Sequence, residues 1–482
     1  MSTGNPLDLP EIRLHVALYL ERHDMVTLLQ VCKSWRETFL PLVWKRVDVG
    51  HSVLHHFESG PSPGLVQRHR GLVVDLIIDG SVRSGYTFNY PNLHRLSLDM
   101  HGEAKEEDAR EENPGALIAL NPSLAILEVY GMNGYLGSAF WRAVAGLPHL
   151  QTLLLNYGDM IDDESSELFC ESCRNLTSLE LVRTSVAKRD AYRSSIFHQM
   201  RILRIELPRN ITPMDQLEFI KCCPGLESLV WHWIVLQGTV STSKEFARQV
   251  TSGVWPNLQK LDLMDLGSQV LDEDIAQIID GMGRATELSF SDSAFGPRAF
   301  TALQRQFGNL HQLKLINCSA VTSSMIQEVL CSCPQLLGLR ADSLLASDVV
   351  EGTPWVCRLM TTLRVCFSFR DHEERLQPLV FGCLSRLDRL ERLYIGYSSE
   401  PRQIDDTVPL DIRLRSGLGA LASLKEIRQL SVTSTAQFMD VAEIEWMGDN
   451  WKKLEQLHGM LNENRRTNDT LRGLLRTHYG WI

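Results

Sequence analysis

The feature that most constrains this chain is a short apolar pattern that recurs along most of its length. Each copy has an apolar residue, two variable residues, a second apolar residue, one variable residue and a third apolar residue. Clear copies begin at Leu93, with the sequence LHRLSL, and at Leu310, with the sequence LHQLKL. Further copies begin at Val73, Leu124, Leu150, Leu176, Met200, Leu226, Leu258, Ala285, Leu336, Leu390 and Ile427. Such repetition indicates one structural unit used many times rather than one compact core.

The spacing of the copies identifies the kind of repeat. Successive copies from Leu93 to Leu336 begin 24 to 32 residues apart, mostly within the roughly 20–29 residues typical of leucine-rich repeats. The alternation predicts a short strand whose leucines point to one side. One strand and one helix cannot bury their own apolar faces, so stacked copies share a core. We therefore predict an α/β solenoid, a leucine-rich-repeat horseshoe over residues 93–435 with a parallel inner sheet.

Helix signals lie between the strands and near the end of the chain. Asp272, Glu273 and Asp274 precede isoleucines at helical spacing, which is typical of a helix start. Apolar residues continue at helical spacing from Val441 to Leu457. Because terminal repeats need a cover, residues 436–482 are predicted to form a helical cap and a tail. Residues 49–92 are predicted to be a linker with room for a first repeat.

The first 48 residues have a different organisation. A helix is expected after Asp8 and Pro10, with an apolar stripe that includes Ile12 and Val16. A second helical segment is expected from about Asp24, and Pro41 is expected to end it. About 40 residues are too few for a comfortable independent core, so this module needs a partner or a neighbouring domain.

These residues resemble an F-box, a helical module with a Leu-Pro start and a later Val-Cys-Lys/Arg-x-Trp block. Residues 9–12 (LPEI) match the start, without the residue that the family commonly has between Pro and Glu, and residues 31–35 (VCKSW) match the block. Residues 313–336 also resemble the cysteine-containing leucine-rich repeats common in F-box proteins. The resemblance implies binding to the Skp adaptor of a cullin–RING ubiquitin ligase. The implied adaptor-binding residues are Leu9, Pro10, Ile12, Val16, Leu20, Leu28, Val31, Cys32 and Trp35.

The resemblance implies a function for the whole chain. We predict the substrate-recognition subunit of a Skp–cullin–F-box ligase, a non-catalytic receptor whose repeats hold a protein substrate near the ubiquitin-charged enzyme. The alternative is a leucine-rich-repeat scaffold with no ligase link, whose N-terminal helices only cap the first repeats. A GTPase-activating repeat protein ranks last, because no arginine or asparagine stands out for that role.

Composition narrows the partners and the compartment. The chain has 48 Lys and Arg against 59 Asp and Glu, a net charge of −11, and no basic stripe, so nucleic acid is not expected as a partner. No apolar run approaches the roughly 18 residues of a membrane span, and the N-terminus does not resemble a signal peptide. The 11 scattered cysteines are expected to be reduced thiols, as in the cytoplasm or nucleus.

Motifs for chemistry are missing from the sequence. Cys170 and Cys173 form a CxxC, but no second pair follows at a spacing suited to zinc, and core cysteines of a repeat explain them better. There is no nucleotide-binding or nucleophile motif. We therefore expect no catalytic residue, no metal site and no cofactor.

A substrate would bind to the inner surface of such a solenoid, where the variable strand positions point. These positions carry both signs of charge and a few aromatic residues, which suits a protein partner better than a phosphate backbone. The predicted substrate-binding residues are Arg95, Asp99, Tyr130, Arg204, His232, Lys260, Arg340 and Tyr394.

Overall fold

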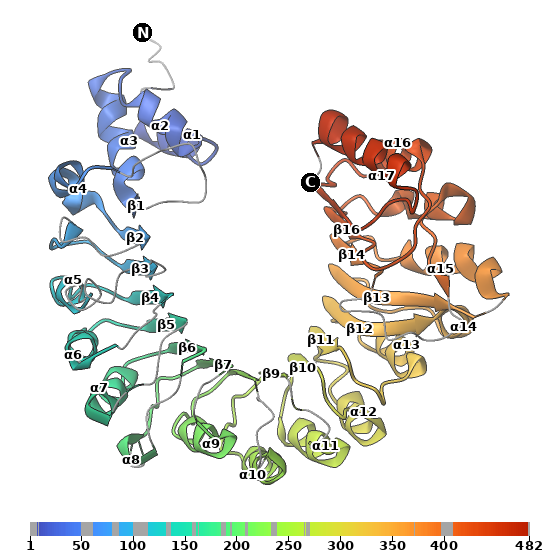
Figure 1. Cartoon of the computed structure of the whole chain (residues 1–482), viewed down its shortest axis with the longest axis horizontal. Helices are drawn as coiled ribbons and strands as arrows, with labels where there is room; N and C mark the ends of the chain where they lie inside the picture. The colour runs from blue at the N-terminus through green and yellow to red at the C-terminus, as the bar shows by residue number, and fades with distance from the viewer. Residues whose placement is uncertain are drawn as a thin grey trace. The chain divides into compact units, whose positions relative to one another are not determined.

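The chain forms two compact units, residues Met1–Leu226 and Glu227–Ile482. The computed structural model describes residues 7, 9–49, 61–79, 86–99, 114–131, 136–156, 161, 163–184, 189–192, 195–207, 211–232, 239–264, 266, 270–370, 372–396 and 408–480. In each unit, short strands run side by side and helices lie along one face of the sheet (Figure 1). The predicted α/β solenoid with a parallel sheet is confirmed.

The first unit begins with three helices and continues into a sheet of seven parallel strands, β1 to β7. Its helices are α1 (Pro10–Ala17), α2 (Arg22–Leu28), α3 (Lys33–Lys45), α4 (Pro63–His69), the short 3₁₀ turn Arg70–Leu72, α5 (Gly115–Ala119), α6 (Ser138–Ala145), α7 (Asp163–Cys173), α8 (Arg189–Tyr192) and α9 (Pro213–Lys221). Its strands are β1 (Arg46–Val49), β2 (Asp75–Asp79), β3 (Arg95–Asp99), β4 (Ile126–Tyr130), β5 (Thr152–Asn156), β6 (Ser178–Val182) and β7 (Ile202–Glu206).

The second unit continues the same repeat. Its strands are β8 (Ser228–His232), β9 (Lys260–Met264), β10 (Glu287–Phe290), β11 (Gln312–Leu315), β12 (Gly338–Leu345), β13 (Thr362–Phe369), β14 (Arg392–Tyr394), β15 (Val408–Pro409), β16 (Gln429–Ser431) and β17 (Gln456–His458). Its helices are α10 (Thr239–Thr251), α11 (Asp272–Gly281), α12 (Pro297–Gln304), α13 (Ser323–Ser332), α14 (Ala346–Glu351), α15 (Gln377–Leu384), α16 (Val441–Asn450) and α17 (Arg465–Leu474), with short turns at Glu373–Leu376, Leu414–Ser416, Leu418–Ser423 and Leu475–Tyr479. β15 pairs antiparallel with β13, and the other pairings are parallel.

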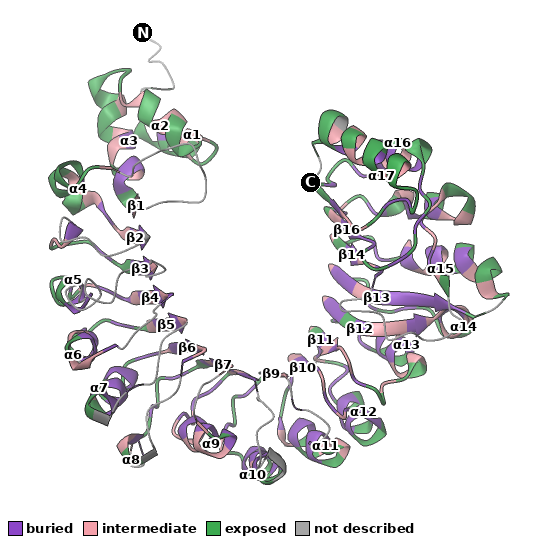
Figure 2. Cartoon of the chain, viewed as in Figure 1, coloured by how far each residue is buried: buried purple, intermediate pink, exposed green. Residues whose placement is uncertain are grey.

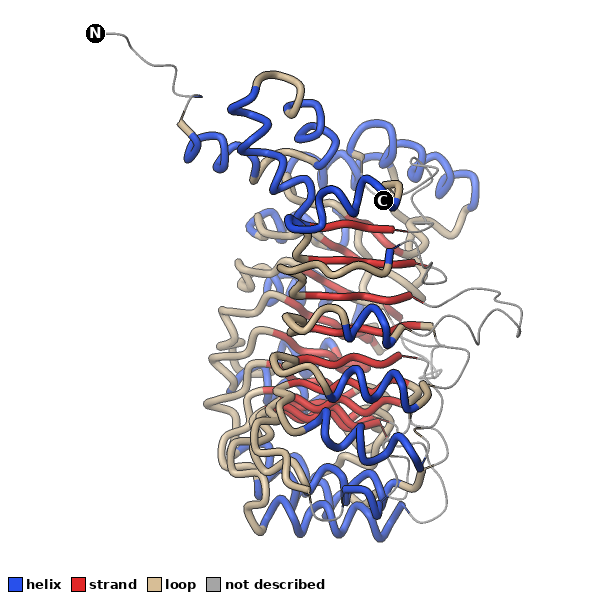
Figure 3. Tube along the Cα trace, turned by 90° about the vertical axis from the view of Figure 1, so that its left-hand side faces the viewer, coloured by secondary structure: helices blue, strands red, loops and turns tan. Residues whose placement is uncertain are grey.

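The repeated leucines explain the register of the strands. In the first unit, Leu96 pairs with Leu127, which in turn pairs with Leu153. All three side chains are fully buried between the sheet and the helices. Burying one leucine side chain is worth about 1.5–3 kcal/mol, so a slip of one residue would turn the whole ladder outward. The tube view shows the resulting parallel strands in rows (Figure 3).

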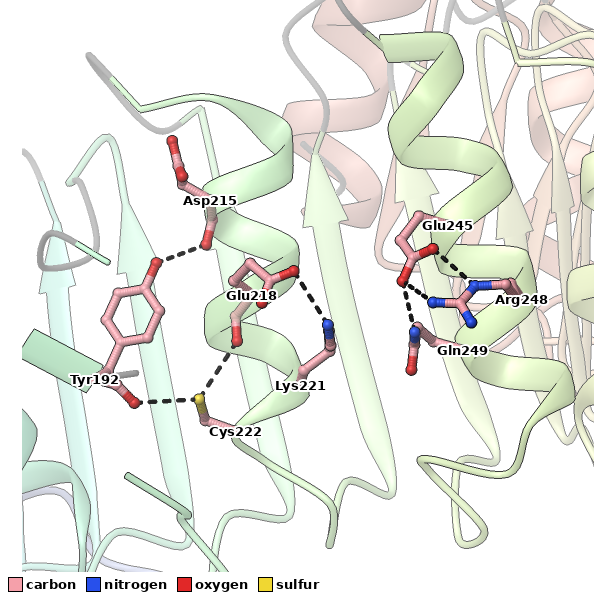
Figure 4. A network of polar contacts seen from close by, with 8 residues as sticks. All are labelled: Tyr192, Asp215, Glu218, Lys221, Cys222, Glu245, Arg248 and Gln249. Atoms are coloured by element: carbon pink, nitrogen blue, oxygen red, sulfur yellow. Dashed lines mark hydrogen bonds and ion pairs between the residues drawn. The ribbon is translucent and has the colours of Figure 1, made fainter. Parts of the chain in front are cut away.

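The helix side is held together by local polar contacts (Figure 4). In the first unit, the Tyr192 hydroxyl donates to the Asp215 carbonyl at 2.8 Å and ties α8 to α9. The Cys222 thiol lies 3.4 Å from the Glu218 carbonyl oxygen. In the second unit, Glu245 of α10 accepts from Arg248 at 2.7 Å and from Gln249 at 2.6 Å. In the described part of the chain, the helices that connect the strands lie on this face of each sheet (Figure 1), and we call the opposite face the open face.

Two expectations for the helical ends are wrong. The second N-terminal segment is two helices, α2 and α3, separated at residues 29–32, and Pro41 lies inside α3 instead of ending it. Burial of Phe39, Val43 and Trp44 on α3 offsets the hydrogen bond that a proline removes. At the other end, α16 stops at Asn450 and β17 follows, so the helical cap predicted from residue 436 contains one more strand of the sheet.

The strand ladder begins earlier than residue 93, where we placed the start of the solenoid. β1 and β2 pair in register, with Val47 opposite Leu76 and Val49 opposite Ile78. Trp44, Val47 and Val49 follow the same apolar spacing as the later repeats. The last turn of α3 therefore supplies the first apolar position of the first repeat.

Candidate functional site

The helices α1, α2 and α3 form a small module at the N-terminal end of the first unit (Figure 1). A Leu-Pro pair starts α1 with Pro10 in its first turn, where a missing N–H costs nothing. The guanidinium of Arg13, almost fully buried, donates from Nη1 to the Ser34 hydroxyl at 2.6 Å and joins α1 to α3. At the start of α2, Glu21 and Asp24 form a reciprocal capping box.

One end of α3 is buried and continuous with the sheet. Phe39 is fully buried, and its ring lies 5.6 Å from the Trp35 ring. Trp44 stacks on His69 of α4 with ring centroids 4.6 Å apart, and burial lowers the pKa of His69 below its ordinary value. The Val74 amide donates to the Lys45 carbonyl at 2.9 Å. The module is therefore fixed to the first repeat at this end.

The other faces of the module are largely exposed (Figure 2). Among the predicted adaptor-binding residues, Leu9 is 53 % exposed and Val31 is 58 % exposed. Pro10, Ile12 and Cys32 are also exposed, and Val16, Leu20, Leu28 and Trp35 are half-buried. Large apolar side chains exposed together mark a surface for a partner. The predicted residues lie on these three helices or in the turns and caps that flank them, and their role in adaptor binding stays a prediction.

Four further apolar residues of the module are exposed but were not in the predicted set. Leu18 and Tyr19, at the end of α1, are 76 % and 78 % exposed. Leu14 on α1 and Val26 on α2 are exposed as well. Tyr19 was expected in the apolar stripe of the first helix as an alternative to Leu20, and helical spacing alone does not show which face of α1 stays exposed. We define the docking surface as the exposed apolar residues Leu9, Ile12, Leu14, Leu18, Tyr19, Val26 and Val31.

The open face of the first unit carries the first four predicted substrate-binding residues. Arg95 donates to the Glu128 carboxylate at 2.8 Å, which raises the pKa of Arg95 above its ordinary value. Burial, with a further contribution from Glu128, raises the pKa of Tyr130. Arg204 forms an ion pair with Glu206. Asp99 lies opposite Tyr130 in the ladder and is half-exposed.

The open face of the second unit carries the other four residues and a hollow of about 390 Å³. Lys260 and Arg340 line this hollow, and Lys260 also forms an ion pair with Glu287 at 2.6 Å. Tyr394 donates from its hydroxyl to Gln429 at 2.8 Å. His232 is buried on β8 and offers little surface to a partner. Lys314 lines the same hollow, although it was not in the predicted set.

Cysteine chemistry follows burial. Cys173 and Cys223 are fully buried, and burial raises the pKa of both thiols well above the ordinary value.

In the part of the chain that the structure describes, no group of three or more His, Cys, Asp or Glu side chains is placed to hold a metal ion. Among the same residues, no helix combines the length and the apolar character that crossing a membrane requires.

Comparison with known proteins adds an assignment for the N-terminal module. The family model described as F-box-like matches residues 8–49, the stretch that contains α1, α2, α3 and β1. No curated protein matches the chain. A solved structure, an internalin (inlF) from Listeria monocytogenes, is similar over 82 % of this chain and 83 % of that chain, with 12 % identity and a TM-score of 0.29. A likeness at that TM-score supports no argument about this chain. The chain therefore has an F-box-like domain at residues 8–49, followed by a leucine-rich-repeat solenoid with a parallel sheet.

Proposed function

We propose that this chain is the substrate-recognition subunit of a Skp–cullin–F-box ubiquitin ligase. The observation that carries the proposal is the F-box-like match at residues 8–49 together with the exposed docking surface on α1 and α2. In this proposal the Skp adaptor covers the docking surface and links the chain to the cullin–RING ligase. A protein substrate binds to the open face of the repeats. The subunit acts in the cytoplasm, the nucleus or both.

The burial of the module favours docking over simple capping. A module that only capped the repeats would direct its apolar side chains at the sheet. Phe39, Val43 and Trp44 do so, and they are buried. Leu9, Leu18 and Tyr19 remain exposed in the described part of the chain. The buried group supports capping by the C-terminal half of α3, and the exposed group supports partner binding by the residues on and beside α1.

The way α3 joins the repeats suits a positioning role. Helix α3 ends at Lys45 and β1 starts at Arg46, so no linker separates the module from the first strand. A direct connection holds an adaptor at a fixed place relative to the first repeats. Fixed placement raises the effective concentration of a bound substrate near the transferring enzyme without chemistry by this chain.

Paired substitutions in the full chain test this proposal. The variant L9A/V31A removes apolar area from the docking surface, and the control L379A/I196A truncates a 52 % exposed leucine and a 58 % exposed isoleucine elsewhere. Binding to the purified Skp adaptor is measured by pull-down and by calorimetry. We expect L9A/V31A to weaken binding roughly tenfold or more, as for residues central to an interface. The control is expected to bind like the wild type.

Point variants are preferable to a deletion of residues 1–48. That deletion would also remove Phe39 and Trp44, which are buried against the first repeats, and would confuse loss of folding with loss of docking. Absence of adaptor binding by the wild-type chain, or equal binding by wild type and L9A/V31A, would contradict the proposal. The first result would favour a repeat scaffold with no ligase link.

A further inference from the structure

Three positively charged side chains lie next to one another on the open face of the second unit. Lys314 on β11 pairs in register with Arg340 on β12, and Arg340 pairs in register with Arg364 on β13. Neighbouring strands are about 4.8 Å apart, so the three residues form a continuous row across three strands. We call these three residues the cationic row.

This row is an unfavourable arrangement for the chain alone. Like charges directly opposite on adjacent strands destabilise a sheet. Two other open-face cations have a carboxylate partner: Arg95 has Glu128 at 2.8 Å and Lys260 has Glu287 at 2.6 Å. No member of the cationic row forms an ion pair with another residue that the structure describes. Among the described residues, the Lys314 ammonium donates only to the Met264 sulfur, at 3.6 Å, and this sulfur is a weak acceptor.

Neighbouring residues hold part of the row in place. The Arg364 guanidinium lies 5.8 Å from the centre of the Tyr394 ring, a cation–π contact that orients the side chain. Burial, and to a lesser degree the charge of Arg340, lower the pKa of Arg364, so both disfavour its charged form. Asp342 partly offsets this charge, but its carboxylate also accepts from the Asn317 amide at 2.7 Å.

The row borders the hollow on this face. Lys314 and Arg340 line it together with Ser289, and its volume is about 390 Å³. That volume accommodates a few side chains of an extended segment and not a folded domain. The acids Asp262 and Glu287 line the hollow too, beside the Lys260 ion pair. A bound segment would therefore contact positively charged residues at β11–β13 and residues of both charges at β9–β10.

We propose that the cationic row binds an anionic group, a carboxylate or a phosphoryl group, on a protein segment that lies across β11, β12 and β13. The inference rests on the proposed function, because the segment would belong to the substrate. An anion there supplies the ion pair that the three residues do not form with any described residue. Arginine suits this task because its planar guanidinium donates two parallel hydrogen bonds to a carboxylate or a phosphate.

The test uses the full chain and three labelled peptides of one length, with three consecutive glutamates, three phosphoserines or three glutamines. Binding is followed by fluorescence anisotropy at low and at high salt. We expect the two anionic peptides to bind, the glutamine peptide to bind at least tenfold more weakly, and salt to weaken binding. The variant R340Q/R364Q is expected to lose roughly tenfold or more of the affinity for both anionic peptides. Preference for phosphoserine over glutamate identifies a phosphoryl group as the recognised anion, the reverse preference identifies a carboxylate, and equal binding shows that the row accepts either anion.

A matched control separates a specific row from overall charge. The variant R375Q/R389Q removes the same charge from two exposed arginines away from β11–β13 and is expected to bind like the wild type. No binding by the wild type up to millimolar peptide, or equal losses in the two variants, would overturn the inference. Adaptor binding by R340Q/R364Q, expected to be unchanged, is measured on the same preparations, together with thermal unfolding to confirm folding. The peptide assay needs no adaptor, so it can fail while the ligase proposal stands, and the reverse.

Discussion

Removal of one carboxylate should loosen a whole helix of the neighbouring repeat. The N-cap of α12, Gly296, has no side chain to satisfy the first amides of the helix. Asp272 of the preceding repeat does so instead. Its carboxylate accepts from the amides of Gly296 at 2.8 Å and of Arg298 and Ala299 at 2.9 Å each. An aspartate from one repeat therefore caps the helix of the next.

The expected cost of Asp272→Ala follows from these three bonds. An N-cap side chain alone contributes about 0.5–2 kcal/mol, and a negative charge at a helix N-terminus adds about 0.3–1 kcal/mol. Asp272 is half-buried, so water replaces part of what is lost. We expect a loss of about 1–3 kcal/mol, which corresponds to a roughly 5- to 150-fold increase in the local opening of α12. Asp272→Asn, which keeps an acceptor but loses the charge, is expected to recover about half of the loss.

The neighbouring residue provides the control. Glu273 also reaches α12, through an ion pair with Arg298 at 2.7 Å, but both side chains are mostly exposed. Exposed pairs contribute about 0–1 kcal/mol, so Glu273→Ala should change little. Hydrogen exchange measured by mass spectrometry on peptides from α12 compares the three variants. If Glu273→Ala reduced the protection of α12 as much as Asp272→Ala, the capping argument would be refuted.

Three further predictions concern the N-terminal module, two glycines and two buried cysteines. Phe39→Ala should lower the unfolding free energy by about 3–5 kcal/mol because its ring is fully buried, whereas Tyr19→Ala should change it by less than about 0.5 kcal/mol; similar thermal melts for the two variants would be inconsistent with this placement. Gly396→Ala should lower the unfolding free energy by about 3 kcal/mol, because the new methyl group would collide with the Thr433 backbone carbonyl. Gly338→Ala should lower it by less than about 1 kcal/mol, because the new methyl group meets only the end of the flexible Gln312 side chain. Urea titration measures both values. Burial raises the pKa of Cys333 and Cys357 to about 12 and shields both thiols from reagents. At pH 8 iodoacetamide should therefore label exposed Cys32 first and the two buried thiols much more slowly. Fast labelling of Cys333 in the folded chain at pH 8 would contradict the burial.

The sequence predicted the solenoid because the core of every repeat depends on the same few positions. Leu313 and Leu339 pair in register, and a polar residue at either position would disrupt the shared apolar core of the repeats. Strands whose copies are less regular were missed for physical reasons. In β17, the position that follows Leu457 by two residues is Gly459, which has a φ of +100° and no side chain to bury. The first repeat was hidden because Trp44, its first apolar residue, also belongs to α3.

The candidate sites depend on which residues share a face or a register, and this limits what a single sequence could give. Leu9 and Val31 were found because the F-box pattern names them, whereas Leu18 and Tyr19 needed the structure, since only the packing of α1 on α3 shows which face stays exposed. To predict the cationic row from the sequence, the copies that form β11, β12 and β13 would all have had to be recognised. Arg340 was in the predicted set, and the copy that contains Lys314 was recognised. Arg364 lies on β13, whose copy of the apolar pattern was not recognised.

The copy that forms β13 begins at Met360, with the sequence MTTLRV, and fits the apolar pattern 24 residues after Leu336. Had it been included, the residue between the second and third apolar positions would have read Lys314, Arg340 and Arg364 in three successive repeats. In a solenoid whose strands pair in register, that position in one repeat lies beside the same position in the next. A run of like charge at one repeat position is therefore readable from sequence as a row on the open face. The register of the leucines both builds the fold and places the charges that we expect a partner to neutralise.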